Sequence, residues 1–402
     1  MPFAILKHAR LLLLGAILVV FFLPLILLIV FAAFHKSSAS DLGSDRLELS
    51  GVVKARPEPA VSFSNWLDHT LQGHFDDQFS KVYGGRALFV RLGNQIYYSL
   101  FDKSYMQDQS IIVGKHHQLY ERWYIEDYCK IRRPMRRETV AARARQIREL
   151  QSELQNRGIP LIVLITPNKA SIYPEDIPEG FCGFPKFSFR DYDSFMSEFA
   201  AQHIQYVDGR AVTLAARAAA AVPLFCQGGT HWNGLGAYYT ARQLTERIGK
   251  LTQTSVGPLF LQRLTVDHSP REIDRDLAAL LNLAVPPYDY PAPHVMVEQR
   301  PAAGQLGKAV FVGGSFNWTL LDLLNKAKVF REIDFYYYYK LALETFPVRT
   351  SKPVDRATID WQKDVLNARV LILEINESNF HSEYITAFLA DLLQFFRKSP
   401  VA

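Results

Sequence analysis

The residue best placed to act as a nucleophile is Ser315. Residues 308–312 have the pattern of a short buried strand, which runs into Gly313-Gly314-Ser315, and residues 317–324 then have helical spacing. A turn between a strand and a helix presents a hydroxyl at the carboxyl edge of a sheet, and its glycines let N–H groups approach an oxyanion. Such junctions also occur as plain tight turns, so the interpretation as a nucleophile needs a partner base.

His231 is the candidate base. It lies with Trp232 in a glycine-flanked loop, residues 228–236, that opens an amphipathic helix running to about Lys250. This arrangement predicts an imidazole at a helix N-terminus beside a large apolar side chain. The alternative is a packed structural histidine with no chemical role.

Together, these two segments resemble the alginate O-acetylation proteins of the AlgJ/AlgX type, a branch of the SGNH hydrolase-like superfamily in which the histidine motif precedes the serine motif. Further segments resemble the family in the expected order, over about residues 70–395: Phe75–Phe79, Leu92–Tyr98, Ile111–Lys115 and Leu161–Pro174. The resemblance implies an O-acetyltransferase or acetylesterase that acts on a cell-envelope or exported polysaccharide through a Ser-His site. It implies no cofactor, and a membrane-bound protein that donates the acyl group as a partner.

One position departs from the family pattern. Active members carry an aspartate two residues before the histidine, and here that position is Gly229. By analogy with serine proteases, a Ser–His pair without an orienting carboxylate should turn over roughly 10⁴-fold more slowly. A backbone carbonyl, Asp208 or Glu374 are the alternative orienters. The gap also leaves open a second hypothesis, a catalytically inactive protein that binds the polysaccharide or scaffolds its modification and export.

Under the acyl-transfer hypothesis, further residues are predicted to hold the oxyanion or the substrate. The Gly314 and Ser315 amides would bind the oxyanion. Residues that follow the last strand lie at the edge where ligands collect in doubly wound sheets, and a tyrosine near a strand end can stack on a sugar. The full set of predicted oxyanion and substrate residues is Gly314, Gly229, Trp232, Asn168, Lys169, Tyr339, Glu374 and Asn376.

Alternating strand and helix patterns predict an α/β fold with a parallel, doubly wound sheet. The predicted strands are 161–165, 204–207, 310–312, 332–337 and 370–375, and the predicted helices are 139–158, 191–203, 211–221 and 382–397.

The N-terminus predicts a membrane anchor. Residues 11–34 contain no charged side chain and are long enough to cross a bilayer, with Lys7 and Arg10 in front of them. A cleaved signal peptide is the competing interpretation. We therefore predict a cytoplasmic N-terminus with a transmembrane helix over 1–36, a linker over 37–65 and an SGNH hydrolase-like domain over 66–402. That domain would lie outside the cytoplasmic membrane.

Composition narrows the remaining function classes. A chain of 402 residues, 49% hydrophobic, with a formal net charge of only +5, does not predict nucleic-acid binding. The cysteines at 129, 182 and 226 match no zinc spacing, and His116-His117 reads as a hairpin tip rather than a metal ligand pair. A bridge between Cys182 and Cys226 would join two loops near the site, and the alternative for each cysteine is a buried free thiol.

Overall fold

A computed structural model describes residues 15, 49–51, 60–74, 86–105, 110–254, 256–299 and 304–398. The predicted transmembrane segment lies outside these residues apart from Gly15. Within the described ranges, no helix has both the length and the apolar character needed to span a bilayer. The chain divides into two units, and the larger comprises residues 106–278 and 287–402.

The smaller unit comprises the described residues up to Tyr105 together with Ala279–Pro286. It contains helices α2 (Phe63–Leu67) and α4 (Arg86–Phe101). The side-chain amide of Asn94 on α4 donates a 2.7 Å hydrogen bond to the carbonyl of Leu281. This contact ties the two stretches of the smaller unit together.

The larger unit is built on a seven-stranded sheet of order β10-β9-β8-β7-β11-β3-β4. The strands are β3 (Leu161–Thr166), β4 (Tyr206–Asp208), β7 (Leu306–Gly313), β8 (Phe330–Tyr337), β9 (Ala342–Phe346), β10 (Thr350–Lys352) and β11 (Val370–Asn376). From β4 to β8 all neighbours are parallel, as predicted. The sheet is mixed, however, because β9 and β10 add antiparallel pairs at one edge. Only residues 338–341 join β8 to β9, too few for the crossover that a parallel pair requires.

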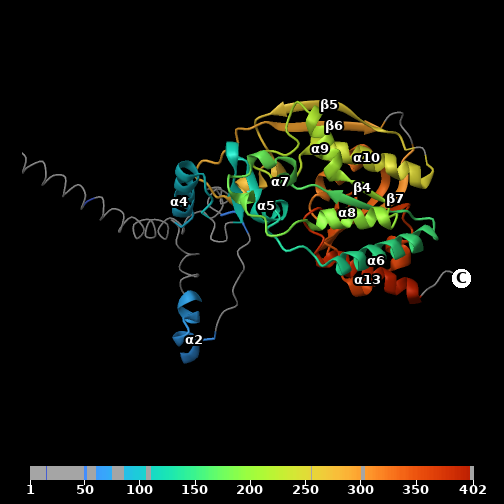
Figure 1. The fold of residues 1–402 in the computed structure, drawn as a ribbon, viewed down its shortest axis with the longest axis horizontal. Coiled ribbons are helices and arrows are strands. Elements are labelled where there is room, and N and C mark those ends of the chain that lie inside the picture. The colour runs from blue at the N-terminus through green and yellow to red at the C-terminus, as the bar shows by residue number, and fades with distance from the viewer. Residues whose placement is uncertain are drawn as a thin grey trace, which may run out of the picture. The chain divides into compact units, whose positions relative to one another are not determined.

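Helices cover both faces of this sheet (Figure 1). On one face lie α6 (Arg137–Gln155), α8 (Asp191–Ala201) and α13 (Glu383–Lys398), which pack into one apolar core. On the other lie α5 (Arg122–Tyr128), α7 (Lys169–Ile172), α9 (Gly209–Ala219), α10 (Gly234–Thr252) and α12 (Asn317–Lys326). The doubly wound α/β architecture is thus confirmed.

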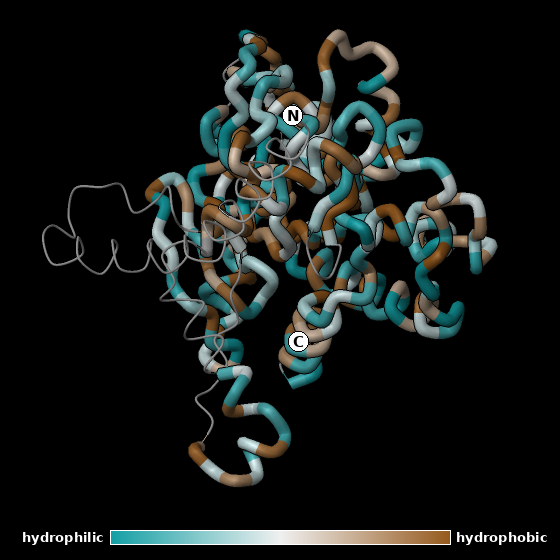
Figure 2. Tube along the Cα trace, turned by 90° about the vertical axis from the view of Figure 1, so that its left-hand side faces the viewer, coloured by the Kyte–Doolittle hydropathy of each residue, from teal (hydrophilic) through white to brown (hydrophobic). Residues whose placement is uncertain are grey.

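Local sequence explains why these elements form. Every residue of β3 and β11 is buried, as expected for central strands covered on both faces, and both are almost continuous apolar runs. The outer helices instead bury a single stripe. In α6 this stripe includes Val140, Ala144 and Ile147. Brown and teal stretches accordingly alternate along the trace (Figure 2).

Two antiparallel pairs lie outside the main sheet. The hairpin of β1 (Ile111–Val113) and β2 (Leu119–Glu121) carries His116 and His117 at its tip, as predicted. The second pair, β5 (Leu259–Asp267) and β6 (Ala292–Gln299), was not predicted, because most of β5 is exposed and lacks a clear apolar face. Residues 268–278, in the connection from β5 to β6, pass next to the candidate site.

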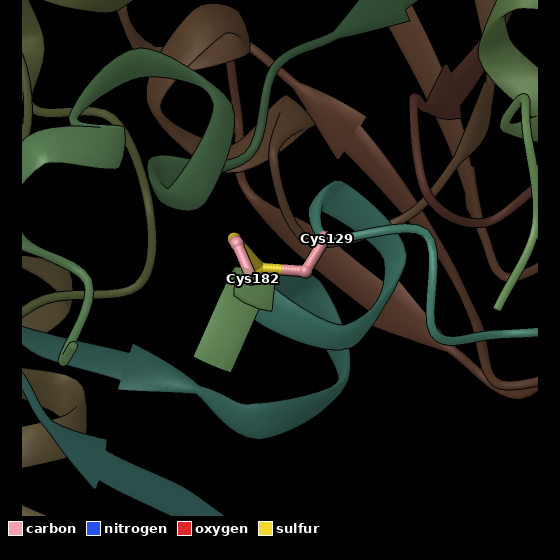
Figure 3. Close-up of a disulfide and its surroundings, with 2 residues drawn as sticks. All are labelled: Cys129 and Cys182. Atoms are coloured by element: carbon pink, nitrogen blue, oxygen red, sulfur yellow. A yellow bond between two sulfur atoms is a disulfide. The ribbon is translucent and has the colours of Figure 1, made fainter. Parts of the chain in front are cut away.

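The disulfide joins Cys129 to Cys182, so the predicted Cys182–Cys226 bridge is wrong (Figure 3). Cys129 follows the end of α5, and Cys182 lies in a short 3-10 turn, with 4.7 Å between their Cα atoms. Cys226 is instead a buried free thiol that packs with Tyr290 and Ala292.

Candidate active site

Ser315 lies in the turn between β7 and α12, at the carboxyl edge of the sheet, and is partly buried. Gly313 makes this turn possible because other groups fill the space beside it. A Cβ at Gly313 would lie 2.5 Å from both the Asn317 side-chain amide and Oε2 of Glu374. The strand, the glycines and the helix therefore present the serine as the sequence predicted.

The imidazole of His231 faces Ser315. Its Nε2 lies 2.8 Å from Oγ of Ser315, although the two residues are 84 positions apart. The ring packs against Phe316 with 4.8 Å between centroids, and Asn233 caps α10 immediately behind it. This is the hydrogen-bonding distance that a serine nucleophile and a histidine base would need.

The second nitrogen of His231 bonds to Asp276, which the sequence analysis did not single out. Asp276 Oδ2 lies 2.7 Å from His231 Nδ1. The other carboxylate oxygen accepts hydrogen bonds from the N–H groups of Thr230 (2.8 Å) and Leu277 (2.7 Å). A carboxylate held in this way keeps Nδ1 protonated, so Nε2 is free to accept the serine proton.

Neither predicted orienter contacts His231 in this way. Asp208 caps α9 by accepting from the Ala211 N–H, and its other oxygen accepts from the Tyr192 hydroxyl. Asp276 comes from the connection between β5 and β6, in helix α11 (Asp276–Leu280). Only its place in the fold distinguishes it from the neighbouring acidic residues, Glu272 and Asp274.

The same connection explains Gly229. A Cβ at this position would lie 2.5 Å from the carbonyl oxygen of Ile273 and 3.1 Å from the backbone of Asp274. The segment that carries Asp276 therefore occupies the space that a side chain at position 229 would need. Gly229 supplies backbone to the site and no oxyanion donor, since its N–H donates to the carbonyl of Cys226.

Glu374 lies beneath the serine turn. It is 1% exposed, and its Oε2 accepts from the Gly314 N–H (2.6 Å) and from the Asn317 side chain (3.1 Å). Its Oε1 accepts from the Thr166 hydroxyl at 2.5 Å, and burial raises the pKa of the Glu374 carboxyl. The Gly314 amide is thus directed inward to Glu374. The prediction that it binds the oxyanion is wrong.

Residues 111–311 match the family model described as the SGNH hydrolase-like domain of the acetyltransferase AlgX. The chain belongs to this family. The match includes His231 and Asp276 and ends four residues before Ser315, so the serine turn lies just beyond it.

Solved structures with a similar trace include three proteins at low sequence identity. The O-acetyltransferase domain of Pseudomonas putida AlgJ is 18% identical, with a TM-score of 0.45, covering 70% of this chain and 98% of that one. Pseudomonas aeruginosa AlgX is 14% identical, with a TM-score of 0.44, covering 70% and 67%. Bacillus cereus PatB1 is 9% identical, with a TM-score of 0.42, covering 68% and 98%. No curated protein sequence matches the chain.

In this AlgX-family chain, Lys169 supports the histidine loop from within the protein. It is 1% exposed, and its Nζ donates to the carbonyls of Cys226 (2.7 Å), Gln227 (2.8 Å) and Gly229 (3.1 Å). Burial lowers the pKa of Lys169 to about 7. The prediction that Lys169 contacts substrate is therefore corrected: it binds the backbone that leads to His231.

Three other predicted substrate residues are buried in structural roles. Asn168 is inaccessible and caps α7 by accepting from the Ser171 N–H. Asn376 donates to the carbonyl of Pro167. Trp232 is inaccessible and donates from Nε1 to the carbonyl of Phe316, which braces the serine turn from below.

Tyr339 lies on the opposite face of the sheet. It is 1% exposed, its hydroxyl donates to Asp391, and its ring packs edge-on against Phe388. Its predicted role in stacking on a sugar is therefore wrong. The adjacent Tyr338 contacts the serine turn instead.

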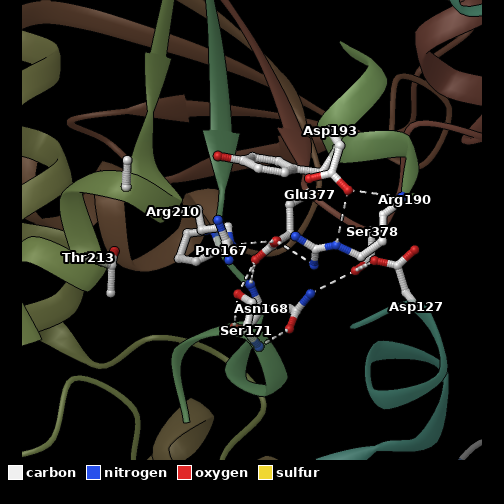
Figure 4. Close-up of polar contacts among 12 residues, drawn as sticks. Asp127, Pro167, Asn168, Ser171, Arg190, Asp193, Arg210, Thr213, Glu377 and Ser378 are labelled. Carbon is white, nitrogen blue, oxygen red and sulfur yellow. Dashed lines mark hydrogen bonds and ion pairs between the residues drawn. The ribbon is translucent and has the colours of Figure 1, made fainter. Parts of the chain in front are cut away.

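A buried polar network holds the loops that follow β3 and β11 (Figure 4). Glu377 is inaccessible and lies between Arg190 (3.3 Å) and Arg210 (3.1 Å), and it also accepts from the Asn168 N–H. Burial raises the pKa of Glu377, and the two guanidinium groups oppose that effect. Because Glu377 is inaccessible and both of its oxygens are held by these groups, we assign it a structural role.

A groove of about 740 Å³ begins one turn after Ser315. Trp318 lies in its wall, with the guanidinium of Arg349 stacked 5.1 Å above the ring. Its lining has side chains of both charges: Arg271, Glu272, Asp274, His294, Asp322, Lys326 and Arg349. Within the described residues, no cluster of three or more His, Cys, Asp or Glu side chains could hold a metal ion.

Proposed function

We propose that Ser315, His231 and Asp276 act as a catalytic triad for acyl transfer, and that the chain is an O-acetyltransferase or acetylesterase of a cell-envelope or exported polysaccharide. The observation that carries this proposal is the continuous hydrogen-bonded series from Ser315 Oγ through His231 to Asp276, with 2.8 and 2.7 Å between the bonded atoms. Membership of the AlgX family supports acetyl as the transferred group.

The reaction would have two halves. Ser315 Oγ attacks the carbonyl carbon of an acetyl ester donor while Nε2 of His231 takes the hydroxyl proton. The imidazolium, stabilised by Asp276, then protonates the leaving group, and acetyl-Ser315 remains. In the second half, His231 takes a proton from a sugar hydroxyl, which attacks the acetyl carbonyl, and the proton returns to Ser315. Water in place of the sugar would give an esterase.

The groove beside Trp318 is a suitable site for the sugar that accepts the acetyl group. An indole face can stack on a sugar ring, and side chains of both charges can bond to hydroxyl and carboxylate groups. Trp318 is only three positions after the nucleophile, so an acceptor bound there would be near the acetyl-serine.

The hypothesis of a catalytically inactive scaffold depended on the missing carboxylate at Gly229. Asp276 is in contact with His231, which removes that reason for preferring it. A protein without catalytic activity would have no need for three side chains from separate segments to be aligned in this way.

We further propose that residues 11–34 anchor the protein in the cytoplasmic membrane and that the globular part lies outside it, near a membrane-bound protein that supplies acetyl groups. The uncharged run and the preceding Lys7 and Arg10 support this orientation. Protease added to intact spheroplasts should digest the globular part. Full protection, or recovery of the protein as a soluble cytoplasmic species, would contradict this location.

The test of function is acetyl transfer by the full chain, purified in detergent. With an activated acetyl ester and a polysaccharide oligomer, the wild type should release the leaving group and acetylate the oligomer. Ser315→Ala and His231→Ala should each abolish both products, and the double variant should be no worse than either, since the residues act as a unit. Activity that survives in both single variants would remove the proposal.

A further inference from the structure

An oxyanion formed at Ser315 needs more than one hydrogen-bond donor. Catalysis at an acyl carbon depends on preorganised donors aimed at the position where negative charge develops. The Ser315 N–H is one such donor. The Gly314 N–H is not available, because Glu374 accepts it at 2.6 Å on the buried side of the turn. The second donor must therefore come from outside the turn.

Tyr338 lies against this turn in an unusual backbone conformation. It directly follows β8, with φ of 48°, and Tyr339 has φ of 56°. Two successive non-glycine residues in the left-handed region are uncommon, and such strain concentrates at functional sites. The N–H of Tyr338 donates to the carbonyl of Gly313 at 2.7 Å, which holds this conformation beside the serine.

This conformation directs the Tyr338 ring onto the turn. A Cβ built on Gly314 would lie 3.1 Å from Cε1 and 3.2 Å from the hydroxyl oxygen of Tyr338. The ring packs edge-on against Tyr384, with 5.6 Å between centroids, and beside Tyr337. Packing on several sides holds the hydroxyl near the nucleophile.

The hydroxyl of Tyr338 lies close to both the side chain and the backbone of Ser315. The N–H is the only backbone hydrogen-bond donor of Ser315. The serine proton can be bonded to Nε2 of His231, which leaves Oγ able to accept from the phenol. Burial raises the pKa of Tyr338, so the phenol keeps its proton at neutral pH.

We propose that Tyr338 is a catalytic residue whose hydroxyl is the second oxyanion donor, in place of the Gly314 amide. In the free protein the phenol oxygen lies near the Ser315 N–H. When Oγ bonds to the acyl carbon, the carbonyl oxygen takes the place of the phenol at this N–H and accepts from both groups. The proton stays on Tyr338 throughout. This inference rests on the proposed acyl-transfer function.

The test compares Tyr338→Phe with the matched control Tyr337→Phe in the full-length protein. Two rates are measured: turnover of an activated acetyl ester, and labelling of Ser315 by a fluorophosphonate. In labelling, the Oγ–P bond forms, fluoride leaves, the proton goes to His231, and the phosphoryl oxygen takes the oxyanion position. Thermal unfolding of both variants checks that they fold.

We expect Tyr338→Phe to lower kcat by about 10- to 1,000-fold with KM little changed, and to slow labelling by a similar factor, because one oxyanion donor is lost. Tyr337→Phe should change neither rate by more than about twofold. If the Tyr338 hydroxyl had only a packing role, Tyr338→Phe would change thermal unfolding but would not lower kcat while leaving KM unchanged.

The failures of the two proposals are distinguishable. If the wild type is labelled on Ser315 and folded Tyr338→Phe is labelled equally fast, Tyr338 is not an oxyanion donor but the acyl-transfer function survives. If the wild type is not labelled at all, both proposals fall. If Tyr338→Phe does not fold, 3-fluorotyrosine at position 338 provides a more acidic donor of nearly the same shape. It should raise kcat, and an unchanged kcat would overturn the inference.

Discussion

Asp276 Oδ2 lies 2.7 Å from Nδ1 of His231, although the two residues are 45 positions apart. The carboxylate in contact with the imidazole thus comes from the connection between β5 and β6, and not from the position two residues before the histidine. Gly229, which occupies that position, is the residue on which this connection packs. A carboxylate can therefore contact the histidine from a different place in the sequence than the one in the family pattern.

If Asp276 orients His231, replacing it with asparagine should lower kcat by roughly 10⁴-fold, because the neutral amide favours the wrong tautomer of the imidazole. Steady-state turnover of an activated acetyl ester measures this. Asp289→Asn is the matched control, since the Asp289 side chain is 93% exposed and bonds to His268. An Asp276→Asn variant within tenfold of the wild type would mean that another group orients His231.

Gly229→Asp should not restore activity to Asp276→Asn, and in the wild type it should reduce both stability and turnover. The new Cβ would lie 2.5 Å from the Ile273 carbonyl oxygen, so the segment that carries Asp276 has to move. Thermal unfolding and ester turnover of Gly229→Ala isolate the effect of the Cβ alone. Gly307→Ala is the control, because its Cβ would make an ordinary 3.8 Å contact. Equal melting temperatures for both alanine variants would contradict the packing argument.

Lys169→Met should destabilise the protein and slow turnover together. It leaves the buried Gly229 carbonyl without a donor, at about 1–3 kcal/mol, whereas the Cys226 and Gln227 carbonyls lose the lysine but keep the N–H donors of Gly229 and Leu119. The loop would relax, and His231 would lose its alignment with Ser315. Lys115→Met is the control, because the Lys115 side chain is 43% exposed and pairs with Glu179, away from the groove. Unchanged kcat in folded Lys169→Met would show that the loop keeps its shape without the lysine.

Asp274 should make stability depend on pH. Burial raises the pKa of this carboxyl from 3.8 to about 6, against a hydrogen bond from the Cys226 thiol and the nearby His294. Between these values the folded state binds more protons than the unfolded state, so its contribution to stability is present at low pH and falls as pH rises through about 6. The free energy of unfolding of wild type minus that of Asp274→Asn should drop by about 2–3 kcal/mol from pH 4 to pH 7. Parallel curves for the two proteins would contradict this.

The sequence predicted the parts of the site that depend on local pattern. The serine turn requires a buried strand, two glycines and a helix start, which are all contiguous in residues 308–324. The loop of His231 is likewise marked by its glycines and by the helix that follows. Both could be recognised because neighbouring residues determine them.

The rest depends on contacts between distant segments. Asp276 reaches the site because β5 pairs with β6. This pairing could not be predicted, because β5 is largely exposed and its sequence has no clear alternation of apolar and polar residues. Lys169 and Glu374 lie near the predicted site, but their long-range hydrogen bonds turn them toward backbone groups instead of substrate. Tyr338 and Tyr339 are adjacent and both have positive φ values, which an alternating strand pattern does not predict.

The most direct test of the account is to identify the residue that becomes acetylated. The full-length protein is mixed with an activated acetyl ester, quenched in acid within seconds, digested and examined by mass spectrometry. We predict one acetyl group on the peptide that contains Ser315, and none on that peptide in Ser315→Ala. If Asp276→Asn slows deacylation more than acylation, more of this acetylated peptide should accumulate in that variant. Acetyl release by the wild type that continues unchanged in Ser315→Ala, or a covalent acetyl on a different residue required for turnover, would contradict the account.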